Sequence, residues 1–492
     1  MKSPAQFDLT PALGYRGTTF PDGPCIQMTM PLAPPTVRSA LDLIGKTPML
    51  ELTALDAGPC RLFLKLENQN PGGSIKDRIA LSMIEAAERD GSLKPGGVIV
   101  EATAGNTGLG LAQVAAPKGY RLILVVPDKM AREKILHLRA MGVEVRLTRS
   151  DVGKGHPDYY QDMAAVIAKE TPGAVYVNQF ENPANPWAHE HGTGPEIWDQ
   201  LEHDVDAVVV GVGSGGTLTG LGRFFRRVSP KTQMILADPE GSILYDYVRT
   251  GKIGKAGSWA IEGIGEDFIP VNAEMDLVAK AYCIPDRESV ETARALLARE
   301  GVLAGSSTGT LLAAALRWCR EQTTPKRVVT LAGDRGDKYL TKVYNDLWVI
   351  AQGLAERQTH GNVLDLIGKR YEEGGVVTVR PDDTLLTAYN RMRVSDISQL
   401  PVVEDDGGLA GILDESDILS AVEGDEATRR ERFQQPVSAA MTTNVRTLPA
   451  QAPLSDLKPI FDRNEVAVVM DGDELLGVIT RVDLINHLRL NA

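Results

Sequence analysis

The chain has 492 residues, 43% of them hydrophobic and 24% charged, and this length and composition exclude a mostly disordered or fibrous protein. Its 52 basic and 65 acidic residues give a net charge of −13, which argues against non-specific binding to nucleic acid or to an anionic membrane surface. The four cysteines are widely spaced, and no apolar run approaches the ~18 residues of a membrane-spanning helix. We therefore expect a cytoplasmic protein without a disulfide framework.

The first part of the chain, residues 1–36, shows little periodicity, which predicts a loosely structured N-terminal tail. From there to about residue 350, short apolar runs alternate with helical stretches. Strands are expected at 61–66, 98–100, 122–126, 142–147, 207–212, 234–237 and 328–331, and helices at 76–90, 106–116 and 132–141. This alternation is typical of βαβ units, so we expect an α/β domain at 37–350 with two lobes and mostly parallel sheets.

The rest of the chain has a different pattern. A polar stretch at 350–360 predicts a helix within a linker at 351–372. Two similar segments follow, which we expect to be copies of one β-α-β-β-α module: residues 373–425 and 434–492. Gly411 and Gly477 occupy equivalent positions 66 residues apart, which indicates an internal duplication. The charged stretch at 423–432 is expected to be a solvated connection between the copies.

The first loop with chemical character is the segment 70–78, Asn-Pro-Gly-Gly-Ser-Ile-Lys-Asp-Arg. The pair Gly72 and Gly73 permits a tight turn after a strand, and a helix is expected to begin near Lys76. A cation at a helix start is disfavoured by the helix dipole, which suits a lysine that works as a neutral amine or as an imine. On this segment alone, an ordinary surface lysine is the alternative.

The second loop, residues 101–108, again joins an expected strand to an expected helix. Its hydroxyl groups and the free N–H groups of a helix start form an anion site that is suited to a carboxylate. The alternative is a well-capped helix in which Thr103 is the N-cap residue.

The third loop, residues 211–217, follows an apolar strand and contains four glycines whose backbone amides can hold a phosphate. It also matches G-x-G-x-x-G, and Asp238 and Glu240 end the next strand about 20 residues later, as in a dinucleotide-binding fold. An NAD-dependent oxidoreductase is therefore an alternative, although it leaves the first two loops unexplained.

The fourth loop, residues 304–309, places small hydroxyl residues between glycines before a helix. Such residues can approach a flat ligand and offer it one hydrogen bond, whereas a plain helix N-cap is the alternative reading. Four such loops are expected in one parallel sheet, and one of them contains a lysine. This combination suits a cofactor that has an aldehyde for the lysine and a phosphate for a glycine-rich loop. The cofactor expected on these grounds is pyridoxal phosphate.

Residues 40–352 resemble the fold-type II pyridoxal-phosphate β-replacement family, which includes the cysteine synthases and the cystathionine β-synthases. The segment 71–78 is similar to the Schiff-base motif of the family, which implies that Lys76 forms the imine and acts as the catalytic base. The resemblance implies further contacts to the cofactor from these residues: Asn106 beside the 3′-oxygen, Ser307 at the pyridine nitrogen, and Gly213, Ser214, Gly215, Gly216 and Thr217 around the phosphate. It also implies a set of substrate-binding residues: Thr103, Ala104, Gly105, Thr107 and Gln179.

Segments 238–242 and 261–270 resemble the cystathionine β-synthases more than the cysteine synthases. The duplicated tail resembles the pair of regulatory repeats (a Bateman module) that carry the name of those synthases. The resemblance implies condensation of serine or O-acetylserine with homocysteine to cystathionine, with possible hydrogen sulfide production. The alternative is a cysteine synthase that uses O-acetylserine and sulfide. Ala104 replaces the usual serine of the family and Phe180 occurs where some members have tyrosine, so the donor stays open between serine and O-acetylserine.

Two further expectations concern ligands. Cys25 is followed by no histidine before His137, so the haem site of the animal enzymes is not expected, and neither is any metal site. In the second repeat, Thr480 and Asp483 resemble the pair that binds a ribose, whereas the first repeat has Asp414 at the threonine position, where a carboxylate repels phosphate. We therefore expect at most one adenosine-type effector site. A purely structural dimerisation module is the alternative, and a homodimer or higher homo-oligomer is expected.

Overall fold

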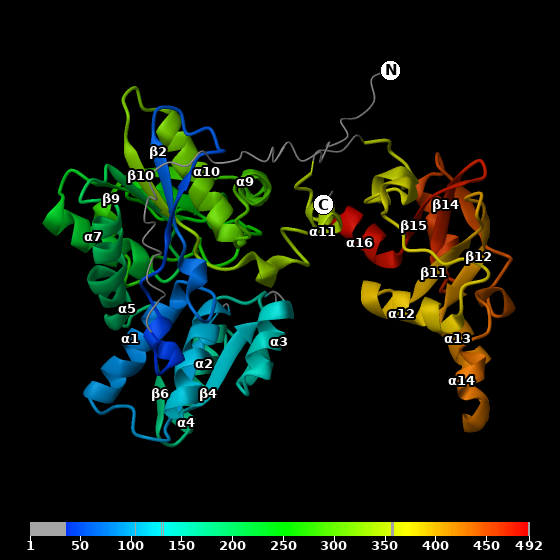
Figure 1. Cartoon of the computed structure of the whole chain (residues 1–492), viewed down its shortest axis with the longest axis horizontal. Helices are drawn as coiled ribbons and strands as arrows, with labels where there is room; N and C mark the ends of the chain where they lie inside the picture. Colours follow the sequence, from blue (N-terminus) through cyan, green and yellow to red (C-terminus); the bar gives the residue numbers. More distant parts are fainter. Residues whose placement is uncertain (1–35, 104, 129, 131, 356–358, 491–492) are drawn as a thin grey trace, which may run out of the picture. The chain divides into compact units, whose positions relative to one another are not determined.

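The computed structural model describes residues 36–103, 105–128, 130, 132–355 and 359–490 (Figure 1). The expected tail at 1–36 lies outside them except for its last residue, as do Cys25 and Ala104. Among the described residues, no helix combines the length and the apolar composition that crossing a bilayer requires.

The larger sheet of the α/β region has six strands in the order β1-β2-β10-β7-β8-β9. Their bounds are β1 (Met49–Leu52), β2 (Arg61–Lys65), β7 (Ala207–Val210), β8 (Gln233–Pro239), β9 (Val278–Ile284) and β10 (Arg327–Leu331). Only the edge strand β1 is antiparallel to its neighbour. All four residues of β7 are buried, as expected for a parallel strand covered on both faces.

The smaller sheet has four parallel strands in the order β5-β4-β3-β6. They are β3 (Val98–Ala102), β4 (Arg121–Pro127), β5 (Glu144–Thr148) and β6 (Ala174–Tyr176). Helices α2 (Asn106–Lys118), α3 (Arg132–Ala140) and α4 (Tyr160–Glu170) pack against it (Figure 1). The two lobes expected from the sequence thus each have a sheet of their own.

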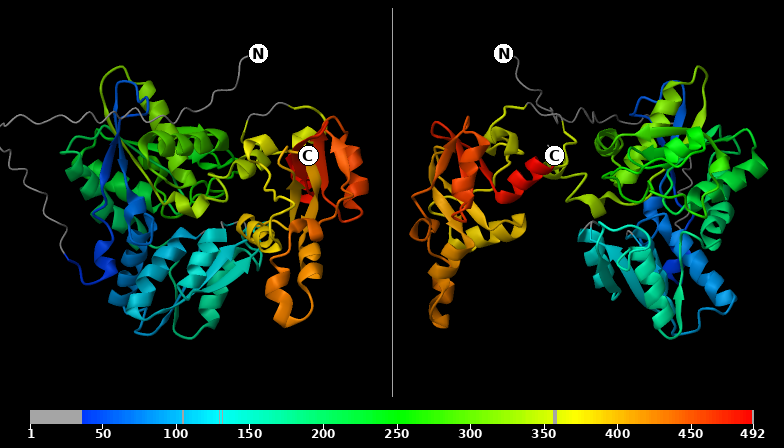
Figure 2. Two further views of the ribbon diagram at one scale, coloured as in Figure 1. Left: turned by 45° about the vertical axis from the view of Figure 1, so that its right-hand side comes forward. Right: turned by 180° about the vertical axis from the view of Figure 1, so that it is seen from behind.

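The remaining helices of the α/β region are α1 (Lys76–Arg89), α5 (Ala184–Ala188), α6 (Gly194–Gln200), α7 (Gly216–Val228), α8 (Leu244–Thr250), α9 (Asp286–Glu300), α10 (Ser306–Arg320) and α11 (Asp346–Ala351). A π-helical turn at His189–Thr193 joins α5 to α6. The buried helix α10 contacts β7, β8 and β10, so it lies on the larger sheet. Four helices, α1, α2, α7 and α10, begin within the four loop segments that the sequence singled out. Figure 2 gives two further views of the helices and strands of the α/β region.

The duplicated region contains a two-stranded sheet in the first copy and a three-stranded sheet in the second. The first copy has α12 (Leu385–Ser395), β11 (Gln399–Val403), β12 (Leu409–Asp414) and α13 (Glu415–Val422), followed by α14 (Arg429–Arg432). The second has β13 (Thr447–Pro449), α15 (Leu457–Phe461), β14 (Ala467–Asp471), β15 (Glu474–Ile479) and α16 (Arg481–Leu490). The charged connection is largely exposed, as expected, although it forms the short helix α14.

Two expectations about local structure are wrong. The helix expected at 350–360 is α11, which begins at Asp346 and ends at Ala351. The chain turns at Gly353, whose φ of +69° is a left-handed conformation that ends the helix. The first strand of the β-α-β-β-α module, which residues 376–379 should form in the first copy, is reduced there to one bridge between Val379 and Val402, so the first copy has one strand fewer than the second.

Candidate functional site

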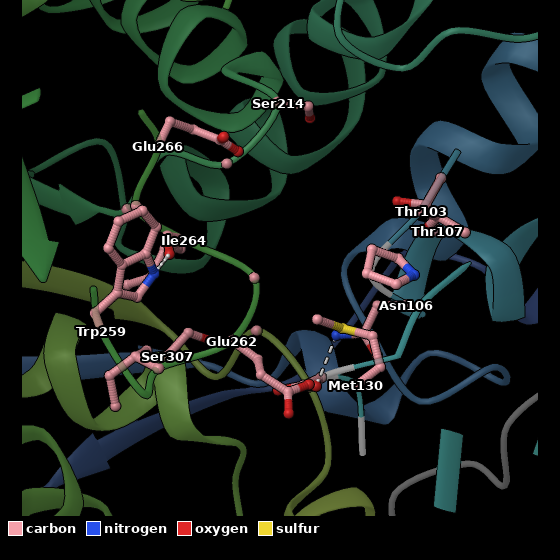
Figure 3. A pocket seen from close by; sticks show the side chains of 18 of the residues that line it. Thr103, Asn106, Thr107, Met130, Ser214, Trp259, Glu262, Ile264, Glu266 and Ser307 are labelled. Atoms are coloured by element: carbon pink, nitrogen blue, oxygen red, sulfur yellow. Dashed lines mark hydrogen bonds between the residues drawn. The ribbon is translucent and has the colours of Figure 1, made fainter. Parts of the chain in front are cut away.

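A pocket of about 790 Å³ collects the four loops that precede α1, α2, α7 and α10. The predicted site residues that line it are Lys76, Thr103, Asn106, Thr107, Gln179, Gly213, Ser214, Gly215, Gly216, Thr217 and Ser307. Figure 3 shows Thr103, Asn106 and Thr107 on one wall and Ser307 on the facing wall. Predicted residues that are spread over more than 230 positions of the chain therefore meet in one cavity.

Lys76 is the first residue of α1, and its side chain lines the pocket. Burial lowers the pKa of Lys76, because desolvation penalises the charged ammonium, while the carboxylates of Asp334 and Glu266 act in the opposite direction. A lowered pKa increases the fraction of neutral amine, which is the form that attacks a carbonyl group and accepts a proton. The direction of this shift favours the neutral amine that the sequence analysis expected of Lys76.

The second loop places Asn106 and Thr107 at the first turn of α2. Gly105 precedes the helix with a φ of +118°, and its N–H donates to Thr103 Oγ1 over 3.1 Å. The N-cap residue is therefore Gly105 and not Thr103, which corrects the capping alternative. No side chain within the described ranges caps this helix start, so its N–H groups can serve a ligand carboxylate.

Gln179 joins this loop from a distant part of the chain. Its Oε1 accepts a hydrogen bond of 2.6 Å from Thr107 Oγ1, and its backbone N–H donates to Glu101 Oε2 over 3.1 Å. Glu101 also accepts the N–H of Ala102, and burial raises the pKa of its carboxyl group to about 8. Glu101 was not among the predicted residues, although a lone glutamate within the otherwise apolar β3 was a visible signal.

The third loop surrounds the start of α7. Gly215 has a φ of +86°, and a Cβ atom at Gly213 would lie 2.6 Å from the carbonyl oxygen of Gly263. A Cβ atom at Gly216 would collide with Asn185 Oδ1, whose amide donates to Ser214 Oγ over 2.9 Å. Only glycine allows this close approach of backbones, which leaves the N–H groups of the helix start open to a phosphate.

Two residues near this loop were missed by the sequence analysis. Asn185 Nδ2 donates to Gln179 O over 2.8 Å in addition to Ser214, so it connects the substrate side with the phosphate side. His189 Nε2 lies 3.3 Å from Thr217 Oγ1, and burial lowers the pKa of this imidazole well below its ordinary value. Asn185 lies in α5 and His189 begins the π-helical turn that follows it, and no local motif marks either residue.

The pocket floor contains charged residues that the sequence did not single out. Asn106 Nδ2 donates to Asp334 Oδ2 over 2.7 Å, and Lys338 Nζ donates to Asn106 Oδ1 over 3.2 Å. Glu262 accepts hydrogen bonds of 2.7 Å from Lys134 and from Lys342. The carboxylate of Glu262 is thus paired with two lysines, and the amide of Asn106 is held from both ends by Asp334 and Lys338.

The arrangement fits pyridoxal phosphate on three observations: a buried amine, a glycine loop packed too closely for a Cβ atom at the start of α7, and polar groups between them. The dinucleotide alternative is less well matched. Asp238 is fully buried, and its Oδ2 accepts the N–H of Tyr245 at the start of α8 over 2.8 Å. This carboxylate is therefore engaged inside the fold, whereas a dinucleotide fold needs it for a ribose hydroxyl.

In the second repeat, the N–H and the hydroxyl of Thr480 both donate to Asp483 Oδ2, over 2.7 and 2.6 Å. In the first repeat, Asp414 and Asp417 exchange backbone-to-carboxylate hydrogen bonds of 2.8 and 3.0 Å. In both copies a backbone N–H thus donates to the aspartate three residues later. The copies differ at the first position, where Thr480 has a hydroxyl that donates to Asp483 and Asp414 has a carboxylate that accepts from Asp417.

Residues 40–334 match the family model described as pyridoxal-phosphate dependent enzyme, and residues 374–424 and 437–490 match the model described as CBS domain. A cystathionine beta-synthase from Dictyostelium discoideum is 34% identical over 463 residues, which cover 91% of this chain and 91% of that protein. Cysteine synthase A from Escherichia coli strain K12 is 40% identical over 309 residues, which cover 62% of this chain and 94% of that protein.

A solved structure of a hydrogen sulfide-producing enzyme from Fusobacterium nucleatum matches with a TM-score of 0.58 at 36% identity, covering 62% of this chain and 100% of that one. The similarity to the Dictyostelium protein is longer than the α/β region and includes the duplicated tail. The chain therefore belongs to the pyridoxal-phosphate dependent enzymes and, within them, to the family of the cystathionine beta-synthases.

Proposed function

We propose that the protein condenses serine, or O-acetylserine, with homocysteine to cystathionine, a β-replacement of transsulfuration that requires pyridoxal phosphate. The observation that carries the proposal is the position of Lys76 in a pocket between two helix starts, those of α2 and α7. One start suits a carboxylate and the other a phosphate. The similarity to a cystathionine beta-synthase over 91% of the chain supports homocysteine as the acceptor.

Lys76 would hold the cofactor through its amine, and as a free amine it would take the α-proton of the bound amino acid. When bound, the cofactor supplies an electron sink for the negative charge left at the α-carbon. Because burial lowers the pKa of Lys76, more of the freed amine is neutral and able to accept this proton.

The loop Thr103–Thr107 binds the carboxylate of the amino acid through the N–H groups at the start of α2, with Gln179 held beside it by Thr107. Residues 213–217 would hold the phosphate of the cofactor, and the hydroxyl of Ser307 would hydrogen-bond its ring nitrogen. A neutral hydroxyl cannot keep that nitrogen protonated as a carboxylate would, which suits loss of a β-substituent more than transamination.

Steady-state kinetics with serine and with O-acetylserine, each combined with homocysteine, test the proposal. We expect cystathionine to form with at least one donor and with a higher kcat/KM than cysteine formation from sulfide. Formation of cysteine from sulfide, with no turnover of homocysteine, would show that the protein is a cysteine synthase instead.

Cysteine synthesis from O-acetylserine and sulfide is the second candidate function. Two observations favour it: the 40% identity to cysteine synthase A, and an aromatic wall without a hydroxyl at Phe180. Phe180 lines the pocket, and its ring centre lies 5.6 Å from that of Phe268. The same assays, with a sulfide probe added, also measure the release of hydrogen sulfide when cysteine is the donor and homocysteine is the acceptor.

The duplicated tail is proposed to bind one adenosine-type effector at the second repeat, through Thr480 and Asp483. The carboxylate of Asp414 at the equivalent position of the first repeat repels a phosphate, so one site per chain is expected. Titration with S-adenosylmethionine, AMP and ATP, read as a shift of the melting temperature, tests this site. No shift with any of the three ligands would favour a purely structural module.

Three further expectations remain part of the proposal. The protein is a haem-free cytoplasmic enzyme, and its purified form should lack a Soret band. It forms a homodimer or a higher homo-oligomer, which sedimentation of the holoenzyme measures directly. A Soret band after expression with added haem would contradict the first expectation.

A further inference from the structure

The side-chain amide of Asn106 is held from both ends. Its nitrogen donates to Asp334 Oδ2 over 2.7 Å, and its oxygen accepts from Lys338 Nζ over 3.2 Å. The two partners lie 228 and 232 residues further along the chain, in the turn after β10. An anion thus faces the donor end of the amide and a cation faces its acceptor end.

Asp334 has little freedom to move. It is 1% exposed, and its Oδ2 also accepts the hydroxyl of Tyr339 over 2.6 Å. Its other oxygen packs so closely against Gly305 that a Cβ atom there would collide with it. The carboxylate is therefore fixed before any ligand enters the pocket.

Lys338 connects the Asn106 loop to the loop of the reactive lysine. This side chain is 5% exposed, and its Nζ donates to the carbonyl oxygens of Gly72 and Gly73, each over 3.2 Å. An ammonium has three N–H donors, so these two carbonyls and the amide oxygen of Asn106 occupy all of them.

An amide side chain can rotate by half a turn and exchange its oxygen and nitrogen with little change of shape. For Asn106, the exchanged state would place an NH₂ group against the ammonium of Lys338 and a carbonyl oxygen against the carboxylate of Asp334. Both contacts would be repulsive in a buried site where electrostatic interactions are strong. The two charged neighbours thus favour one orientation, in which Nδ2 carries a second N–H besides the one that Asp334 accepts.

We propose that Asp334 and Lys338 are positioning residues that set the direction of the Asn106 amide, so that its second N–H faces the 3′-oxygen of the cofactor. This inference rests on the proposed function, because it assigns Asn106 to cofactor binding. Asp334 and Lys338, which lie outside the four glycine-rich loops, thereby become part of the proposed site.

A double-mutant cycle on the holoenzyme tests the inference. The single variants are Asn106→Ala and Asp334→Asn, and the double variant combines them. The measured quantity is the rate at which pyridoxal phosphate leaves the protein after dilution, followed by the visible absorbance of the bound cofactor. Asp337→Asn is the matched control, because Asp337 is exposed in the same turn.

We expect each single variant to release the cofactor about tenfold faster, the order expected for a lost charge-assisted hydrogen bond. We expect the double variant to release it no faster than Asn106→Ala, since Asp334 acts through Asn106, and we expect Asp337→Asn to behave as the wild type. Additive losses in the double variant would overturn the inference while leaving Asn106 in its proposed role. Unchanged release from Asn106→Ala would overturn both.

If Asp334→Asn does not fold, Lys338→Gln takes its place in the double-mutant cycle. This variant removes the ammonium that donates to the amide oxygen of Asn106. A second measurement is the pH at which the visible absorption band of the bound cofactor changes. A variant that only loosens the packing should leave this pH unchanged. Removing the negative charge of Asp334 beside Lys76 should shift this transition to lower pH, because less charge remains to stabilise the protonated form. If Asp334→Asn shows the absorbance transition at the same pH as the wild type, this second expectation is wrong.

Discussion

The hydroxyl of Thr107 donates a hydrogen bond of 2.6 Å to Oε1 of Gln179, a residue 72 positions further along the chain. This contact joins the helix start that is proposed to bind the substrate carboxylate to the segment that follows β6. Both side chains are buried, so the bond is not exchanged for water. This single hydrogen bond therefore holds the side chains of Thr107 and Gln179 together at the pocket wall.

Replacement of Thr107 tests this contact. Thr107→Val removes the donor and leaves Oε1 of Gln179 without it, so we expect KM for the amino-acid donor to rise about tenfold, the order of one unsatisfied buried acceptor. Thr232→Val is the control, because that hydroxyl also donates inside the fold, to Val205 O over 2.7 Å. A similar rise of KM in both variants would show a general effect on stability.

Replacement of the reactive lysine separates catalysis from binding. We expect Lys76→Ala to reduce turnover by about 10³-fold or more, because the general base is lost, and to keep part of the cofactor through the phosphate loop. Turnover and bound cofactor are measured on the same preparation, with the exposed Lys94→Ala as control. Normal activity in Lys76→Ala would sink the proposed mechanism.

The glycine cradle predicts a steric effect. Gly213→Ala places a Cβ atom 2.6 Å from Gly263 O, so the loop must move, and we expect the affinity for pyridoxal phosphate to fall about tenfold or more. At Gly254, the nearest atom to an added Cβ is Asp246 Oδ2 at 3.8 Å, so Gly254→Ala should bind like the wild type. Equal affinity of the two variants for pyridoxal phosphate would show that the loop around Gly213 does not bind the phosphate.

The buried carboxyl of Glu101 predicts a pH dependence. Burial raises its pKa from 4.5 to about 8, so between these values the folded state holds a proton that the unfolded state has released. The contribution of this group to stability is therefore complete below about pH 4.5 and is lost as the pH rises through 8. We expect the melting temperature of the wild type to fall over this interval.

The variant Glu101→Gln isolates this effect. It cannot titrate, so its melting temperature should change less between pH 5 and pH 9 than that of the wild type. It should also be lower at pH 5, because an NH₂ group cannot accept both N–H groups of Ala102 and Gln179. Parallel curves for the two proteins would show that Glu101 is charged throughout.

The two repeats provide an internal comparison for the effector site. We expect Asp483→Ala to abolish the melting shift caused by an adenosine-type ligand, because it removes a ribose acceptor and frees Thr480. Asp417→Ala makes the equivalent change in the first repeat and should leave the shift intact. Loss of the shift in both variants would indicate that the ligand uses both copies.

The sequence predicted the part of the site that is written in contiguous segments. Lys76, Asn106 and Gly213 each lie in a glycine-rich loop between a strand and a helix, and the local pattern alone predicts the loop. The chemistry expected of them followed from the four loops taken together and from the resemblance to a known family. Asp334 and Lys338 could not be found in this way. They reach Asn106 only because β10 pairs with both β2 and β7, and strand order is not visible in local periodicity.

The errors in the fold have a similar origin. The polar stretch after residue 350 has helical character, but Gly353 ends the helix at α11. The apolar residues at 376–379 have strand character, but only Val379 finds a partner, Val402. In both segments, the local preference was read correctly and the neighbouring structure decided the outcome.

The insertion of β10 between β2 and β7 also dictates when the catalytic region can be completed during synthesis. Strand β2 is made early and pairs with β1, but its other edge stays open until residues 327–331 have left the ribosome. The same applies to Lys338, which secures the Gly72–Gly73 turn ahead of Lys76. The N-terminal part of the pocket must therefore wait for a strand made more than 260 residues later, and a nascent chain that stops before β10 has an exposed sheet edge and no assembled site.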